Sequence, residues 1–147
     1  MNQNQKLILR EQILNETCFL INQFYNDENN KISIEQFVEE VIKRSYTSFY
    51  TLRLTNIYLS KIIEDKKQVD ICGKKLFIAA LIVSTKVHLD NGYTNKAWLK
   101  IIGGLTIKEI NCIEITFLKI MEYKLFVNID KINKKYYNPN KMNVFDE

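Results

Sequence analysis

The residues whose side chains could act in catalysis are few and far apart. His88 is the only histidine, and the three cysteines, Cys18, Cys72 and Cys112, form no CxxC pair. A catalytic triad or a zinc site needs several such groups brought together. No HExxH, GxSxG or phosphate-binding loop occurs either. The sequence therefore predicts no catalytic residue, no metal site and no cofactor, and it favours an interaction module over an enzyme.

The composition fits one globular domain. The 147 residues are 46% hydrophobic, enough for a sizeable core, and the net charge of +4 is mild. The lysines are spread along the chain and only Arg10, Arg44 and Arg53 are arginines, whereas a nucleic-acid surface gathers basic residues on one element. No signal peptide and no run of roughly 18 apolar residues is present, and scattered cysteines are typical of a reducing compartment. We expect an intracellular protein of the cytoplasm or nucleus, with no membrane partner and no direct nucleic-acid partner.

The spacing of apolar residues predicts an all-α fold. Glycine and proline are scarce, and apolar residues recur every three or four positions. We predict an amphipathic N-terminal helix at about 6–25, five further helices and a short C-terminal helix. The five are expected at about 33–44, 49–64, 74–89, 96–102 and 107–122, and the last at 129–137.

Polar residues mark where several of these helices begin and end. Ser33 and Thr106 each stand three residues before a glutamine or glutamate, the spacing of a capping box. Asn95 is expected to cap the helix at 96–102, and Gly103 to end it in a left-handed conformation.

The helix at 74–89 combines a buried character with a charge. Residues 77–84 are apolar or small on every side, which is typical of a helix at the centre of a core. Lys86 follows two residues later, and Val83, Lys86, Val87 and Asp90 lie along one stripe. This pattern predicts that the helix leaves the core at Lys86. A solvated lysine favoured by the helix dipole is the alternative.

The helix at 107–122 carries two neighbouring rows of side chains, although one row is enough to pack against the core. The first row is Ile110, Ile113, Phe117 and Ile120, and the second is Glu114, Leu118 and Met121. The second row needs another partner, which is either a different protein or the N-terminal helix of the same chain.

Three segments, read in order, resemble a known family. They are "ISIEQF", "LFIAALIVSTKVHLD" and "YTNKAWLKIIGGLTIKEINCIEITFLKIMEYKLFV". Together they resemble a cyclin box, most closely that of the phosphate-pathway cyclins of yeast and the U-type (P-type) cyclins of plants. The resemblance implies a single five-helix bundle around a central helix at 31–137, preceded by an N-terminal helix and linker at 1–30 and followed by a tail at 138–147.

The resemblance also implies a function. A protein of this family is expected to be a regulatory subunit that binds a cyclin-dependent Ser/Thr protein kinase as a heterodimer and holds its C-helix in the active position. Lys86 and Glu114 match the polar centre of the family's kinase interface. The apolar contacts around them match Val83, Val87, Leu118, Tyr123 and Leu125. Asp90, one turn beyond Lys86, is a further kinase-binding candidate, whose carboxylate could take the place of an activation-loop phosphate.

Two departures from the family pattern qualify this expectation. Glu40 and Ser60 stand where most cyclin boxes pair an arginine with an aspartate, and the "MRAIL"-like docking patch of cell-cycle cyclins is absent. The alternative is a cyclin-fold scaffold or transcription-type adaptor that binds protein or DNA without a kinase.

Overall fold

The computed structural model describes residues 2–27, 32–88, 92–128 and 142–145, and within these ranges every regular element is a helix. The helices are α1 (Gln3–Asn22), α2 (Ile34–Ser45), α3 (Phe49–Glu64), α4 (Gly73–His88), α5 (Asn95–Ile102) and α6 (Ile107–Ile120). The all-α class and the N-terminal helix plus five are therefore confirmed. The predicted C-terminal helix at 129–137 lies outside the described residues.

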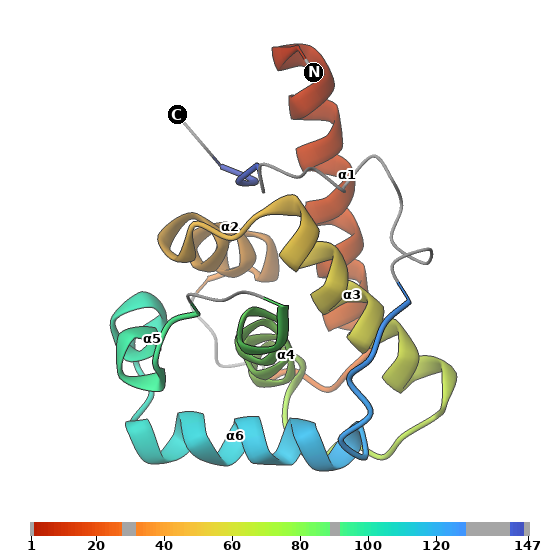
Figure 1. Ribbon diagram of the computed structural model, residues 1–147, viewed down its shortest axis with the longest axis vertical. Helices are drawn as coiled ribbons and strands as arrows, with labels where there is room; N and C mark the ends of the chain where they lie inside the picture. The colour runs from red at the N-terminus through yellow and green to blue at the C-terminus, as the bar shows by residue number, and fades with distance from the viewer. Residues whose placement is uncertain (1, 28–31, 89–91, 129–141, 146–147) are drawn as a thin grey trace.

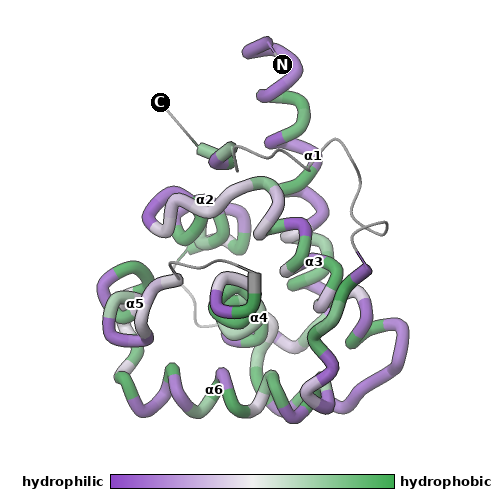
Figure 2. Tube along the Cα trace, in the orientation of Figure 1, coloured by the Kyte–Doolittle hydropathy of each residue, from purple (hydrophilic) through white to green (hydrophobic). Residues whose placement is uncertain are grey.

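Helix α4 occupies the centre of the fold. Figure 1 views it end-on, with the other five helices arranged around it. Residues 76–85 are all buried, because neighbouring helices cover α4 on every side and only an apolar or small side chain fits there. Figure 2 shows the same contrast by colour, with hydrophobic residues on α4 and hydrophilic ones along the loop that joins α3 to α4.

The helix starts follow the polar signals of the sequence, with one exception. Thr106 and Glu109 form the full capping box, and Ser33 accepts a hydrogen bond from the backbone of Gln36. The prediction for Asn95 is wrong: Thr94 caps α5, because its hydroxyl accepts the backbone N–H of Ala97 at 3.2 Å. The side chain of Asn95 is thereby left for a different set of contacts.

Helix α1 is part of the bundle. It packs against α2, α3 and α4 and lies on the opposite side of the molecule from α6 (Figure 1). The alternative in which the N-terminal helix covers the second row of α6 is therefore wrong. That row faces elsewhere, with Met121 buried and Glu114 and Leu118 half-buried.

A set of polar residues, which we call the α1–α3 polar cluster, ties α1 to α3. Its members are Glu16, Thr17, Arg53 and Asn56. The Glu16 carboxylate accepts hydrogen bonds from Arg53 at 2.6 Å and from Asn56 at 2.9 Å, and Thr17 lies 3.1 Å from the Asn56 side-chain oxygen. Thr17 and Asn56 are completely buried, so these contacts satisfy polar groups that water does not reach.

The positions of the family's buried arginine–aspartate pair play no such role. Glu40 lies 3.9 Å from Arg44 on the exposed surface of α2, and Ser60 is half-buried on α3. Because both members of the pair are replaced, neither of these two positions leaves a lone charge inside the bundle.

The entry into α4 depends on a glycine and an asparagine. The backbone N–H of Gly73 donates to the carbonyl of Tyr25 at 2.6 Å, and a Cβ at Gly73 would lie 2.5 Å from the backbone oxygen of Ile21. Only glycine permits that approach. Asn26 donates to the Ile21 carbonyl and accepts from the backbone N–H of Lys74, so it caps the end of α1 and the start of α4 together.

Residues 142–145 also pack against the bundle. The backbone N–H of Val144 donates to the carbonyl of Thr47 at 2.9 Å, and the Val144 side chain is completely buried. The Phe145 ring contacts two cations, with the Arg10 guanidinium 4.7 Å and the Lys43 ammonium 5.1 Å from its centroid. This segment therefore contributes to the core, although it comes from the far end of the chain.

Candidate functional site

The C-terminal end of α4 meets the middle of α6 at an ion pair. The Lys86 ammonium lies 3.0 Å and 2.8 Å from the two carboxylate oxygens of Glu114. The side chain of Lys86 is 37% exposed and that of Glu114 only 14%, so the lysine faces solvent over a carboxylate that the fold largely encloses. The prediction that α4 leaves the core at Lys86 is confirmed.

Two asparagines complete this group, which we call the Lys86 cluster (Lys86, Asn95, Asn111 and Glu114). The side-chain amide of Asn95 donates to Glu114 at 2.8 Å and to the side-chain oxygen of Asn111 at 2.7 Å. The remaining Asn95 oxygen is buried and has no hydrogen-bond partner among the described residues. Three helices thus hold one carboxylate in place. The structural reason is that Thr94, rather than Asn95, caps α5.

The two residues before Lys86 are buried polar residues, and one of them ties α4 to α3. The Ser84 hydroxyl lies 3.0 Å from that of Thr55 on α3 and donates to the carbonyl of Ala80, while Thr85 bonds to the carbonyl of Ile82. Both side chains are buried. The "STK" of the sequence therefore combines one hydroxyl that bonds to α3, one that bonds within α4, and one outward-facing ammonium.

Exposed or half-buried apolar side chains lie on the same two helices, α4 and α6, and on the chain just beyond α6, and we call them the apolar rim (Val87, Ile115, Leu118, Tyr123, Leu125 and Phe126). Val87 is 45% exposed and Tyr123 63%, while Leu118 and Leu125 are half-buried. Val83, a predicted contact, is only 2% exposed, so it lies beneath this surface as part of the core.

Sequence reasoning missed two members of the rim. Ile115 is 50% exposed and Phe126 is 90% exposed. Ile115 could have been found, because it stands three residues before Leu118 and therefore on the same face of α6. Phe126 has no periodic signal, since it follows the end of the helix.

A tight turn presents Tyr123. Helix α6 ends in the hydrogen-bond pattern of a Schellman motif, in which the N–H of Tyr123 donates to the carbonyl of Leu118 and the N–H of Glu122 to that of Lys119. Both Glu122 and Tyr123 have positive φ, at 53° and 57°. Residues other than glycine adopt that conformation at a cost of roughly 1 kcal/mol or more, so the fold specifies this turn strongly.

Tyr58 on α3 anchors the chain beyond the turn. Its hydroxyl donates to the backbone carbonyl of Leu125 at 2.7 Å, and its ring packs edge-on against Phe117 with centroids 5.8 Å apart. Burial raises the pKa of the Tyr58 hydroxyl to about 12, so it stays protonated as a donor at neutral pH. The position of Leu125 in the apolar rim is fixed through this bond.

The other predicted site features are quickly placed. Asp90 and the side chain of His88 lie outside the described residues. Among the residues that the structure describes, no three potential metal ligands come together. No described helix has the length and hydropathy to cross a membrane.

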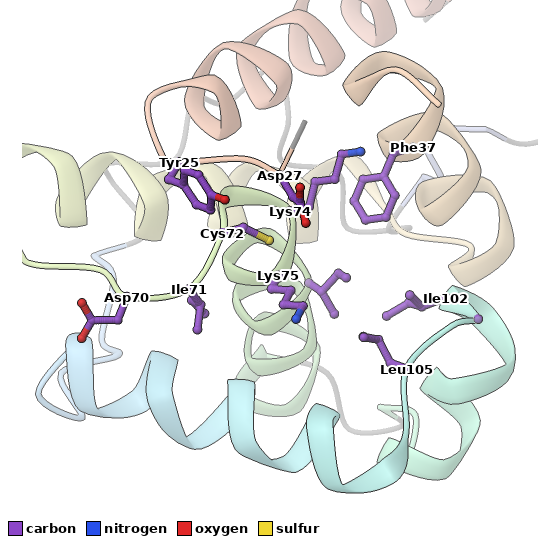
Figure 3. A pocket seen from close by; sticks show the side chains of 12 residues that line it. Tyr25, Asp27, Phe37, Asp70, Ile71, Cys72, Lys74, Lys75, Ile102 and Leu105 are labelled. Atoms are coloured by element: carbon purple, nitrogen blue, oxygen red, sulfur yellow. The ribbon is translucent and has the colours of Figure 1, made fainter. Parts of the chain in front are cut away.

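A hollow of about 400 Å³ lies at the opposite end of α4 from Lys86, and we call it the α4-entry hollow. Figure 3 shows its lining, in which Lys74 extends toward the Phe37 ring. The Lys74 ammonium is 5.2 Å from the centroid of that ring. Asp27, Asp70 and Lys75 also line the hollow, so its charges are mixed.

Comparison with known proteins gives this surface its context. The sequence profile of the family described as Cyclin matches residues 4–125. The chain is 31% identical over 111 residues to PHO85 cyclin-5 of Saccharomyces cerevisiae, 30% over 105 residues to Cyclin-U4-2 of Arabidopsis thaliana, and 29% over 105 residues to G1/S-specific cyclin pas1 of Schizosaccharomyces pombe. These alignments cover 70%, 69% and 67% of this chain.

The chain belongs to the cyclin family. The resemblance to yeast phosphate-pathway cyclins and plant U-type cyclins is confirmed, since relatives of both groups match. The chain spans about half the length of the first two of these relatives, 48% each, and 25% of the third. The matched range begins within α1, in keeping with the packing of that helix into the bundle.

Proposed function

We propose that this chain is a regulatory subunit that binds a cyclin-dependent protein kinase and holds its C-helix in the active position. The observation that carries the proposal is the Lys86 cluster: a fixed carboxylate and a solvent-facing ammonium on two helices that also carry exposed or half-buried side chains of the apolar rim. Membership of the cyclin family supports the choice of partner.

The arrangement suits a helix of another protein. When a partner covers exposed apolar side chains, their burial contributes favourable free energy. The polar groups beside them fix the geometry of the hydrogen bonds to the partner. In the free chain both contacts of the Lys86 ammonium go to Glu114, and an ammonium has three donors. The remaining N–H can reach a backbone carbonyl or a carboxylate of the partner while Glu114 stays in place.

Such a subunit contributes no catalytic group to phosphoryl transfer. The kinase becomes active when a strand lysine pairs with a glutamate of its C-helix, and a partner that binds this state more tightly shifts the equilibrium toward it. A differential affinity of roughly 5.5 kcal/mol converts a mostly inactive population into a mostly active one. An interface of this chemical make-up is suited to that task.

Co-purification tests the proposal directly. The tagged chain is co-expressed in turn with each member of a panel of cyclin-dependent kinases, and the retained kinase is assayed for phosphoryl transfer to a peptide. We expect at least one kinase to be retained and activated by the wild-type chain. The purified chain alone is expected to show no ATP turnover.

The matched variants are Lys86→Ala and Lys108→Ala. Lys108 is an exposed lysine in the first turn of α6, so its removal changes the net charge equally. Loss of the kinase with the first variant and retention with the second supports the interface. Failure of the whole panel to bind, or equal retention by all variants, contradicts it.

A further inference from the structure

A shallow groove of about 410 Å³ lies between the C-terminal end of α2 and the helix α5. We call it the basic groove. Three cationic side chains line it, from Arg44, Lys96 and Lys100, together with the tyrosines Tyr46 and Tyr93. No carboxylate is among its lining residues. The surface is therefore positively charged although the protein as a whole carries only +4.

The cations are poorly neutralised by their surroundings. Lys96 and Lys100 are one turn apart on α5, and neither forms an ion pair with any residue that the structure describes. Arg44 has Glu40 at 3.9 Å and the Ile101 carbonyl at 3.5 Å, both at the outer limit of such contacts. Like charges placed this close repel one another, and an anion bound between them removes that repulsion.

The backbone of Tyr46 and the side chain of Tyr93 are held in place beside the cations. Tyr46 has a φ of 54° and ends α2 in a Schellman pattern. Its own backbone N–H donates to the carbonyl of Lys43, and the N–H of Thr47 donates to the carbonyl of Ile42. The Tyr93 hydroxyl donates to the carbonyl of Ser45 at 3.1 Å. The ring of Tyr93 also packs edge-on against that of Trp98, with centroids 5.5 Å apart. The groove thus has one preformed wall, formed by Tyr93, as well as charge.

Two other hollows among the described residues do not share this character. The α4-entry hollow of Figure 3 combines Lys74 and Lys75 with Asp27 and Asp70. A third, smaller hollow at the end of α6 contains Glu122, which pairs with Lys67 at 3.0 Å. Both therefore hold charges of each sign, and of these three hollows only the basic groove has a lining that favours an anion.

We propose that the basic groove is a docking site for an anionic segment of a partner protein, with a phosphorylated serine or threonine as its central group. A phosphate carries a charge of about −1.5 to −2 at neutral pH and three acceptor oxygens. The Arg44 guanidinium presents a planar pair of donors to such a group, and the two lysine ammonium groups supply further charge. The tyrosine rings contact the neighbouring residues of the segment.

The size and composition of the groove favour a peptide over a nucleic acid. A nucleic-acid surface follows the phosphate backbone with an extended stripe of basic residues and uses several arginines. Here one arginine and two lysines line a single small groove. The groove shares no residue with the Lys86 cluster or the apolar rim, so this proposal does not depend on kinase binding.

Nuclear magnetic resonance on the free chain tests it. The ¹⁵N-labelled protein is titrated with a short peptide that carries one phosphoserine between glycine and alanine residues. The same peptide with serine, the same peptide with glutamate, and a DNA oligonucleotide of equal charge serve as the other arms. We expect saturable shifts of the backbone amides at 44–46 and 93–100 with the phosphopeptide, weaker shifts with the glutamate peptide and none with the serine peptide.

A charge-matched pair of variants sharpens the result. Lys96→Glu with Lys100→Glu reverses the charge of the groove, whereas Lys108→Glu with Lys119→Glu makes the same change in net charge on exposed positions of α6. We expect the first pair to lose at least tenfold in phosphopeptide affinity and the second to lose little.

Four outcomes overturn the proposal. They are the absence of saturable shifts, shifts that map to other residues, equal losses in the two variant pairs, and tighter binding of the oligonucleotide at the same amides. The peptide titration of the unmodified protein decides the matter even where a variant does not fold.

Discussion

The α1–α3 polar cluster and the Lys86 cluster contain nearly the same chemical groups but differ in their surroundings. Each contains a glutamate, a cation and an asparagine that donates to the glutamate. The arginine of the first is 23% exposed and its asparagine completely buried, whereas the lysine of the second is 37% exposed. The first cluster joins two helices of the same fold. The second packs against the fold on one side only. Its other side faces solvent, on helices that also carry exposed apolar side chains.

The difference teaches that the surroundings of a polar cluster, rather than its composition, indicate its role. A guanidinium fixed by a carboxylate between two helices has little left to offer a partner, and losing it destabilises the chain. A half-exposed ammonium above an enclosed carboxylate keeps one N–H donor free for a partner. Burial of the apolar rim by that partner is also favourable. The predictions below treat the two clusters in parallel.

The largest effect is expected at the Lys86 cluster, on kinase affinity. Truncation of Lys86 or Glu114 to alanine removes one partner of a charged network that the kinase would bury, which typically costs about 2 to 5 kcal/mol, or roughly 30- to several-thousand-fold in affinity. The double variant should lose less than the sum, because the two residues share contacts. Titration calorimetry with the cognate kinase measures this.

The stability of the same variants provides the contrast. Since Lys86 is more than a third exposed, Lys86→Ala should lower the free energy of unfolding by only about 0 to 1 kcal/mol. Urea unfolding followed by circular dichroism measures it. A Lys86→Ala variant that melts far below the wild-type chain would show that the interface has been placed wrongly.

The next largest effect is expected at the α1–α3 polar cluster, on stability. Glu16→Ala removes the acceptor that Arg53 and Asn56 share, and hydrogen bonds to charged groups contribute about 1.5 to 3 kcal/mol. We expect the midpoint of urea unfolding to fall while the folded variant keeps its kinase affinity. An affinity loss as large as that of Glu114→Ala would remove the distinction between the clusters.

Asn95→Ala should have a smaller effect, again on binding. Without its amide, Glu114 keeps the ion pair with Lys86 and loses one of the donors that orient it. We expect a loss of about 0.5 to 1.5 kcal/mol in kinase affinity, the usual range for one hydrogen bond. An unchanged affinity in calorimetry would mean that Lys86 alone fixes the carboxylate.

The smallest effect concerns Tyr58, which connects the fold to the apolar rim. Tyr58→Phe removes the hydrogen bond to the Leu125 carbonyl and should cost about 0.5 to 1 kcal/mol of stability at neutral pH. Burial raises the pKa of the folded hydroxyl above its unfolded value, near 10, to about 12. Its contribution is therefore complete below pH 10 and is lost as the pH rises from 10 to 12.

Unfolding curves across that pH range check this prediction. The wild-type chain should lose stability more steeply than Tyr58→Phe between pH 10 and 12, because the variant has no proton to release at this position. Parallel curves for the two proteins would exclude a role for the Tyr58 hydroxyl.

Much of the fold could be predicted because its signals are local. Helical periodicity gave the bounds of α3 at Phe49–Glu64, and Thr106 with Glu109 marked the start of α6. The run at 77–84 identified the central helix, since only burial on all sides accommodates it. Stripe geometry placed Lys86 at the exit from the core. Each of these depends on residues within four or five positions of one another.

The remainder depends on contacts between distant residues. The sequence made Asn95 a helix cap, and only the packing of α5 against α6 shows that it holds Glu114 instead. The α1–α3 polar cluster joins residues 37 to 40 positions apart, and no local pattern marks them as partners. Val144 gave no sign in the sequence that it would enter the core.

The sequence by itself determined the all-α class, the central helix, the membership of the cyclin family and the pairing of Lys86 with Glu114 as candidates. The tertiary structure alone decided how far each side chain is exposed: that Val83 is buried, that Val87, Ile115 and Phe126 are exposed, and that three cations line one groove beside α5. The physical reason is that helical propensity and capping act over a few residues along the chain. Exposure and charge clustering depend on which helices lie side by side, and this is fixed only when the whole core packs.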